Sequence, residues 1–150
     1  MKTDSSDKKE KRVDSHYNLS DIEFDKQFSN CVLDPKLFSH EAHLRLGWLN
    51  IKNYGLEKGE ERIQQQLLNY VEHVGAQDKY NTTVTIVAMR AINHFMKQSK
   101  TKSFKDFIAE NVRLKTNFKE LIAKHYSYDI FITDIGKDKF IEPDVLPFSI

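Results

Sequence analysis

The sequence predicts an all-α protein, a compact single-domain bundle of five to seven helices with an extended C-terminal strap. Three observations support this prediction. Glycine and proline are scarce, with 5 and 3 residues in a chain of 150, which leaves few turns for a β architecture. Apolar residues recur at helical spacing along most of the chain. Capping residues stand at the starts and ends of these apolar runs.

Residues 1–18 are predicted to form a disordered charged tail before a helical domain of residues 19–150. Basic and acidic side chains are mixed in this tail, and almost nothing apolar is available for burial. His16 belongs to the tail and is given no role. Over the whole chain 23 basic and 22 acidic residues leave a formal net charge of +1. We therefore expect neither nucleic acid nor a membrane among the partners.

Cysteine content and apolar runs bear on the location of the protein. Cys31 is the single cysteine, so no intrachain disulfide can form, and we expect it to be a small core residue. Charged residues stand where a secretory leader has its apolar region. No apolar run approaches the ~18–20 residues that cross a bilayer. We expect a cytoplasmic protein; the sequence names no cofactor and leaves a homodimer open.

Caps and glycines mark the first three predicted helices. Ser20 caps a helix over about 20–30, which ends before the break at Asp34 and Pro35. Ser39 caps a second helix that runs to residue 54, and a glycine follows it. The third helix is expected over about 56–73, before another glycine. The apolar surface of the first helix is assigned to Ile22, Phe24 and Phe28.

Residues 81–99 allow two interpretations. The stretch "TTVTIV" is rich in β-branched residues, which favours a strand. The run is long, however, and its apolar residues keep a helical period to the end. Since no second strand-like run is available for pairing, we predict a helix. Its buried stripe is assigned to Val84, Ala88, Ile92 and Phe95.

Two shorter helices and a strap complete the predicted chain. Ser103 and Asp106 resemble a capping box at the start of a fifth helix that ends near 111. Thr116 is predicted to cap a sixth helix. Short turns and the segment "IEPDVLPFSI" follow, and two prolines there exclude a regular helix. One face of the sixth helix is assigned to Phe118, Leu121, Ile122 and His125.

His40 and His43 carry the main chemical interest, because they start an amphipathic helix. At about 100° per residue both project toward the side that its apolar residues bury, with His43 at the edge. A histidine in such a place needs a hydrogen bond, a metal or a ligand for its ring nitrogens. The charged residues Glu41, Arg45 and Lys52 fall on another side of the helix.

The helix of residues 81–99 offers polar groups that can meet these histidines. Asn81 and Thr85 project from its apolar stripe, and the small residues Gly47 and Ala88 leave volume nearby. Together these observations predict a polar-lined pocket for a small molecule. Its expected residues are His40, His43, Asn81, Thr85 and His125, with Trp48, Tyr54 and Tyr80 as walls.

Three stretches, "FSHEAHLRLGWL", "KYNTTVT" and "HYS…FIEPDVLPF", resemble landmarks of an uncharacterised family of small all-helical bacterial proteins. The family pattern reads F-x-H-x-x-H-L-R, then Y-H-x-T-x-T, then Y-S and E-P-D-L-x-P-L-P. The match spans roughly residues 22–148. It implies the helical fold and the place of the site, but no reaction. The matched positions are Phe38, His40, His43, Leu44, Arg45, Tyr80, Thr83, Thr85, Tyr126, Ser127, Glu142, Pro143 and Asp144.

A metal site is one alternative interpretation of the histidine pair. The order H-E-A-H lacks the H-E-x-x-H spacing of a zinc protease, and a catalytic zinc usually has three protein ligands. The histidine of the family's middle motif is Asn81 here, so a three-histidine site loses a ligand. Either His125 or Glu142 would have to replace it. General acid–base chemistry by a buried histidine, with Tyr80 or Thr85 orienting a substrate, is a second alternative.

We expect a pocket that binds a small polar metabolite. An extension of this hypothesis is that the protein also catalyses a reaction of that metabolite. The alternative from another class is a structural or protein-interaction module, in which His40 and His43 bond backbone carbonyls and serve only the fold. A metal-binding enzyme using the same two histidines is the second alternative. Glu142 and Asp144, on either side of Pro143, are expected to fix the strap rather than to act in catalysis.

Overall fold

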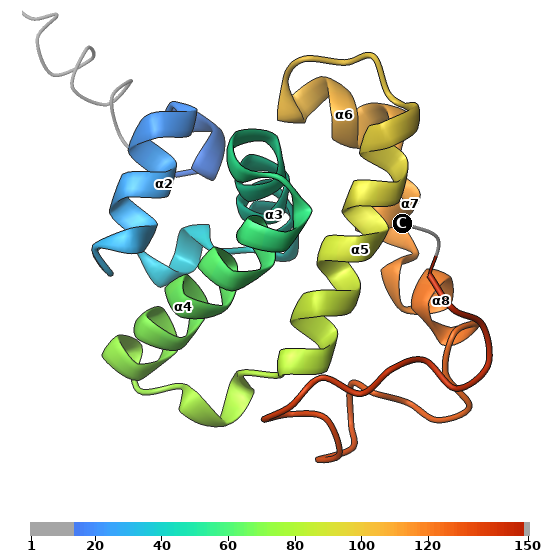
Figure 1. Cartoon of the computed structure of the whole chain (residues 1–150). Coiled ribbons are helices and arrows are strands. Elements are labelled where there is room, and N and C mark those ends of the chain that lie inside the picture. The colour runs from blue at the N-terminus through green and yellow to red at the C-terminus, as the bar shows by residue number, and fades with distance from the viewer. Residues whose placement is uncertain (1–13, 149–150) are drawn as a thin grey trace, which may run out of the picture.

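The computed structural model in Figure 1 describes residues 14–148. Within that range the chain forms α-helices, short 3-10 turns and irregular segments, and it contains no strand. The predicted all-α class is therefore confirmed. Residues 1–13 of the predicted tail lie outside the described residues.

The helix α3 (His40–Tyr54) lies at the centre of the bundle. It packs against α4 and α5, and it also contacts α2, α6 and α7 (Figure 1). The segment after α8, residues 124–148, is called the strap below. The remaining helices are α2 (Asp21–Ser29), α4 (Leu56–Val74), α5 (Thr82–Gln98), α6 (Phe104–Glu110), α7 (Arg113–Thr116) and α8 (Phe118–Ala123), and the 3-10 turns are η1 (His16–Asn18), η2 (Pro35–Leu37) and η3 (Gln77–Lys79).

Most of the predicted helix ends are found. The side chains of Ser20, Ser39 and Ser103 each accept a hydrogen bond from a first-turn N–H, as N-caps do. Gly55 separates α3 from α4 at a φ of 83°, and Gly75 ends α4 at a φ of 74°. Both conformations favour glycine, because a side chain is strained at positive φ.

The predicted sixth helix is two helices, and Thr116 does not cap it. Thr116 is the last residue of α7, and its hydroxyl donates to the carbonyl of Val112 at 3.1 Å. The chain turns at Asn117, which has a φ of −132°, before α8 begins. Because α8 ends at Ala123, His125 lies beyond the helix and not on its apolar face.

The stretch "TTVTIV" is helical, as predicted from its period. Asn81 caps α5, and the next two N–H groups donate to the strap, from Thr82 to Lys137 O at 2.7 Å and from Thr83 to Gly136 O at 3.0 Å. The buried Thr83 hydroxyl donates to Gly136 O at 2.8 Å and accepts from the Ile141 N–H at 3.1 Å. These threonines therefore hold the strap over the start of α5.

A second set of bonds fixes the end of the strap, as predicted for Asp144. Its carboxylate accepts from the Ser127 N–H at 2.9 Å and from the Ser127 hydroxyl. The Tyr126 hydroxyl donates to Ile141 O at 2.6 Å, and the ring of His125 donates from Nδ1 to Leu146 O at 2.7 Å.

The prediction that Arg45 lies on a charged face of α3 is wrong, because only 5% of the Arg45 surface is exposed. Its guanidinium donates to the carbonyls of His16 at 2.7 Å and Leu19 at 2.9 Å, and to Asp21 Oδ1 at 2.8 Å. His16, predicted to be in the tail, is itself buried in η1. Arg45 thus joins η1 and the start of α2 to the central helix.

Other placements differ from the sequence prediction. Ile22 is 81% exposed, so α2 packs through Phe24 and Phe28. Cys31 is half-buried at a φ of 59° rather than enclosed in the core.

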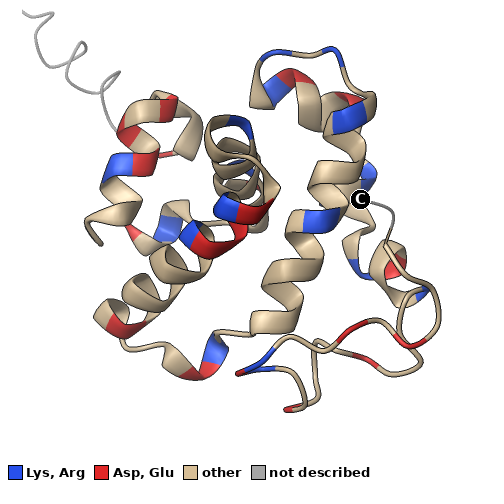
Figure 2. Ribbon diagram, viewed as in Figure 1, with Lys and Arg blue, Asp and Glu red and all other residues tan. Residues whose placement is uncertain are grey.

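Figure 2 shows acidic and basic residues intermixed on α2 and α4, whereas α5 is almost uncharged. The described residues include no helix long and apolar enough to span a membrane.

Two glycines test the helix packing. A Cβ added to Gly59 would lie 3.1 Å from the backbone oxygen of Asn50, whereas one added to Gly47 would lie 2.8 Å from the end of the Ile92 side chain. We expect Gly59→Ala to lower the free energy of unfolding by ~1–3 kcal/mol, because backbone cannot yield. Gly47→Ala should cost less, since Ile92 can turn into an adjoining cavity. Urea unfolding measures both, and equal or reversed costs would contradict this packing.

Candidate functional site

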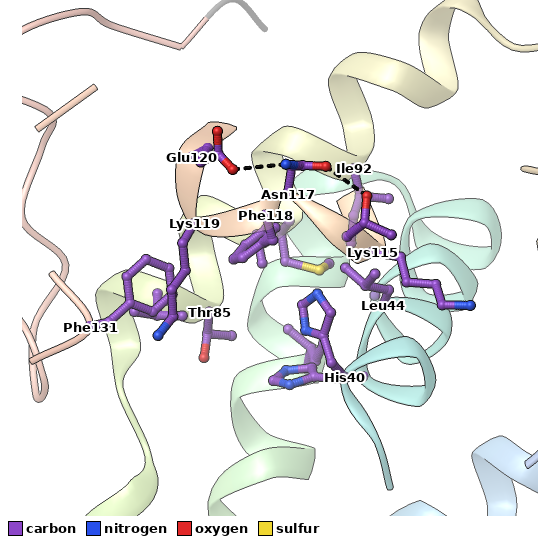
Figure 3. A pocket seen from close by; sticks show the side chains of 17 residues that line it. His40, Leu44, Thr85, Ile92, Lys115, Asn117, Phe118, Lys119, Glu120 and Phe131 are labelled. Carbon is purple, nitrogen blue, oxygen red and sulfur yellow. Dashed lines mark hydrogen bonds between the residues drawn. The ribbon is translucent and has the colours of Figure 1, made fainter. Parts of the chain in front are cut away.

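A cavity of about 520 Å³ lies between α3, α5 and the α7–α8 pair. This volume is in the usual range for small-molecule sites. Figure 3 shows Thr85 and Phe131 on one side of it, His40 and Leu44 on the other, and Phe118 between them. We call it the large cavity.

The large cavity is not the polar-lined pocket that the sequence predicts. Nine of its seventeen lining residues are apolar or glycine, and they form the inner walls: Leu44, Gly47, Ile63, Val84, Ala88, Met89, Ile92, Phe118 and Phe131. Gly47 and Ala88 both border it, as predicted. The polar lining residues are His40, His43 and Thr85 from α3 and α5, and Lys115, Thr116, Asn117, Lys119 and Glu120 from the α7–α8 segment.

His40 serves the fold. Its side chain is exposed, and its Nε2 lies 3.0 Å from the carbonyl oxygen of Leu114. The ring also packs beside Phe118, with 5.3 Å between ring centroids. His40 therefore ties the start of α3 to α7, as the structural alternative predicts for both histidines.

His43 behaves differently. Its Nε2 is buried, and within residues 14–148 this atom has no hydrogen-bond partner. Burial lowers the pKa of His43 to about 4, and the nearby His40 acts in the same direction. The ring is thus neutral at neutral pH, so one ring nitrogen donates and the other accepts. An unpaired buried polar atom costs ~1–3 kcal/mol, which a bound hydrogen-bonding group would offset.

Asn81 does not reach toward His43 as predicted. Its side-chain oxygen accepts from the Val84 N–H at 3.0 Å, and its amide nitrogen donates to Ile130 O at 3.0 Å. Both ends of this amide are therefore used in capping α5 and holding the strap. Thr85 does line the large cavity, with its hydroxyl proton donated to Asn81 O at 2.8 Å.

A smaller cavity of about 270 Å³ adjoins the large one, and we call it the Tyr80 cavity. The Tyr80 hydroxyl is buried there, and like His43 Nε2 it has no hydrogen-bond partner in the described chain. His43, Val84 and Thr85 line both cavities. Its other lining residues are Phe38, Leu67, Tyr70, Val71, Val74, Ala76, Lys79 and Asn81.

Three predicted site residues lie elsewhere. His125 packs against Phe148 within the strap, with 4.1 Å between ring centroids. Trp48 is buried against Phe104, because it faces α6 rather than α5. Tyr54 is 48% exposed at the end of α3. The sequence could not show which neighbouring element each side chain of α3 faces, because α3 is covered on several sides.

The described residues offer His40 and His43 no third protein ligand for a metal ion. Among residues 14–148 there is no group of three or more His, Cys, Asp or Glu side chains placed to hold a metal ion. The two suggested third ligands are engaged elsewhere, His125 with Leu146 and Glu142 with Arg90 at 3.8 Å.

Sequence reasoning missed the walls that α7, α8 and the strap supply. Phe118 is assigned by its spacing to an apolar face without a partner, and Phe131 lies in an irregular segment that carries no periodic signal. Met89 is outside the predicted buried stripe of α5, although it is almost fully buried.

Comparison of the chain with protein-family models, with curated proteins and with solved structures found no match. The family resemblance therefore stays a prediction that rests on its motifs. The matched positions fall into two groups in the structure. Arg45, Thr83 and Asp144 hold the fold together, whereas His43 and Tyr80 are cavity-lining residues that each carry a buried polar atom without a hydrogen-bond partner in the described chain.

Proposed function

We propose that this protein binds a small, mostly apolar molecule in the large cavity and holds a polar group of that molecule at His43. The observation that carries the proposal is the buried Nε2 of His43, which within the described residues has no protein partner and belongs to a ring that lines the cavity. The apolar walls revise the expected ligand from a polar metabolite to an amphipathic one.

The lowered pKa of His43 favours binding over acid catalysis. A ring with a pKa of about 4 holds no proton to give at neutral pH, and it is a weak base. Its remaining capacity is to donate one hydrogen bond and accept another, which selects an uncharged partner. The apolar walls would then provide most of the affinity.

The protein-interaction alternative is favoured by a different observation. Several large apolar side chains of the strap are exposed: Ile132 at 82%, Ile135 at 61% and Val145 at 58%. The fold-serving bonds of His40 agree with the same alternative. It does not account for the buried Nε2 of His43.

A blocked cavity tests the proposal. Ala88 lines the large cavity and is half-buried, so Ala88→Phe places a ring inside it. We expect calorimetry to detect binding of octanamide to the wild type and not to Ala88→Phe. Hexanamide should bind the wild type roughly tenfold more weakly than octanamide, since each buried CH₂ contributes ~0.8 kcal/mol.

Ala123→Phe, at an exposed position on α8, is the matched control and should bind like the wild type. Equal binding of octanamide to the wild type and to Ala88→Phe would contradict the proposal, as would no binding to the wild type.

A further inference from the structure

Two residues that line one small space beside the large cavity each carry a buried polar atom. The Nε2 of His43 and the hydroxyl of Tyr80 have no hydrogen-bond partner within residues 14–148, and both residues line the Tyr80 cavity. They come from different parts of the chain, His43 from the first turn of α3 and Tyr80 from the residue that follows η3. No other buried side-chain atom of the described residues is left in this state.

The other polar groups around the Tyr80 cavity have partners. The Tyr70 hydroxyl donates to Leu33 O at 2.9 Å, and both ends of the Asn81 amide are bonded. The remaining walls are apolar apart from Thr85 and the exposed Lys79. The His43 nitrogen and the Tyr80 hydroxyl are therefore the groups left to recognise a guest, with the side chains of Thr82 and Thr85 close to that hydroxyl.

The two cavities meet at His43, Val84 and Thr85, which line both. A molecule with its apolar part in the large cavity can extend a polar end past His43 toward Tyr80. The surroundings disfavour a charge at that end, because burial raises the pKa of Tyr80 and lowers that of His43, each shift favouring a neutral ring.

We propose that the Tyr80 cavity is the polar subsite of the ligand site, and that it takes an uncharged group that both donates and accepts hydrogen bonds, a carboxamide or a hydroxyl. The group bonds to His43 Nε2 and to the Tyr80 hydroxyl, while the apolar remainder of the same molecule lies in the large cavity. This inference rests on the proposed function and adds the chemical class of the ligand.

Four probes of equal chain length test the ligand class: octanamide, octanol, octanoate and octane. In titrations of the full chain at neutral pH we expect octanamide and octanol to bind more tightly than octane. Octanoate should bind more weakly than octanamide, because the two buried groups of the subsite are neutral and Lys79, the cation in its wall, is exposed to solvent.

Two tyrosine variants separate the subsite from the fold. Tyr80→Phe removes only the open hydroxyl, whereas Tyr126→Phe removes a bonded hydroxyl from a tyrosine that lines neither cavity. We expect Tyr80→Phe to weaken octanamide about tenfold, to leave octane unchanged, and to keep or raise the melting temperature. Tyr126→Phe should lower the melting temperature and keep the affinity of the folded protein for octanamide.

The outcomes distinguish the two proposals. If all four probes bind with similar affinity, or if Tyr80→Phe leaves octanamide unchanged, the polar subsite is overturned and water alone fills the Tyr80 cavity, while the large cavity stands as a binding site. If octanoate binds most tightly, the uncharged class is wrong. If octanamide binds to Ala88→Phe as to the wild type, the proposed function itself fails.

Discussion

Arg45→Met should lower the free energy of unfolding by roughly 2–4 kcal/mol, because it leaves two buried backbone carbonyls without their donor and each such group costs ~1–3 kcal/mol. The guanidinium reaches two backbone carbonyls of residues 16–19 and the carboxylate of Asp21, and it lies over the Phe24 ring at 4.7 Å. Without it, η1 keeps the hydrogen bond from the Tyr17 hydroxyl to Glu41 of α3 but loses the contact at the His16 carbonyl. Urea unfolding followed by circular dichroism measures the loss.

Two further variants locate the origin of this effect. Arg45→Lys keeps the charge but not the planar fork, so we expect it to recover only a small part of the stability. Lys52→Met, on the same helix, removes an exposed cation that lies 4.9 Å from the Trp48 ring, and its cost should stay within ~1 kcal/mol. Equal costs for Arg45→Met and Lys52→Met would contradict the anchoring role.

The stability of the protein should fall as the pH is lowered from 6.5 toward 4.5, with His43 as a main cause. In the unfolded chain this histidine takes up a proton near its ordinary pKa of 6.5, whereas folded His43 stays neutral until its pKa of about 4. Since the unfolded state binds more protons in this window, unfolding becomes easier as the pH falls. The contribution of this one group amounts to roughly 2–3 kcal/mol over the two pH units.

The difference between the wild type and His43 variants isolates this contribution. Burial and Arg45 lower the pKa of His16 too, so His16 adds a change of the same sign, which cancels in the difference. Both His43→Leu and His43→Gln remove the titrating ring, and both should lose less stability than the wild type from pH 6.5 to 4.5. A difference that is flat with pH would show that His43 is protonated in the folded state.

Below that window the acidic residues change the pH dependence. Burial is the largest single effect on Asp25, and it raises the pKa. Hydrogen bonds from Arg62 and Gln66 together outweigh burial and hold the pKa of Asp25 below its usual value. Such a carboxylate stabilises the fold at pH values above its pKa in the unfolded state. This contribution is lost as the pH falls through its lower pKa in the folded state. We therefore restrict the histidine comparison to pH 4.5 and above.

Local signals in the sequence predict most of the helical fold. Helix boundaries depend on local signals, namely a serine cap, a glycine stop and an apolar period of 3.6 residues. The helices α2 to α6 therefore begin and end close to the expected residues. The division of α7 from α8 was missed, because Thr116 uses its hydroxyl on the preceding turn rather than as a cap.

The site was predicted less completely, since it depends on tertiary contacts. Helical projection brought His43 and Thr85 to the right place, and the small residues Gly47 and Ala88 indicated volume there. Projection alone does not say which neighbour covers a face. It therefore placed Trp48 at the site and Arg45 on a separate charged side of the helix, although both side chains are buried against other elements.

The most direct test of the proposed binding site is a measurement of nuclear Overhauser effects between octanamide and the methyl groups of the labelled protein. We expect the octyl chain to contact the methyl groups of Leu44, Val84 and Ile92, all of which line the large cavity. Contacts to Leu146 of the strap instead, or no intermolecular contacts at saturating octanamide, would contradict a ligand site in the large cavity.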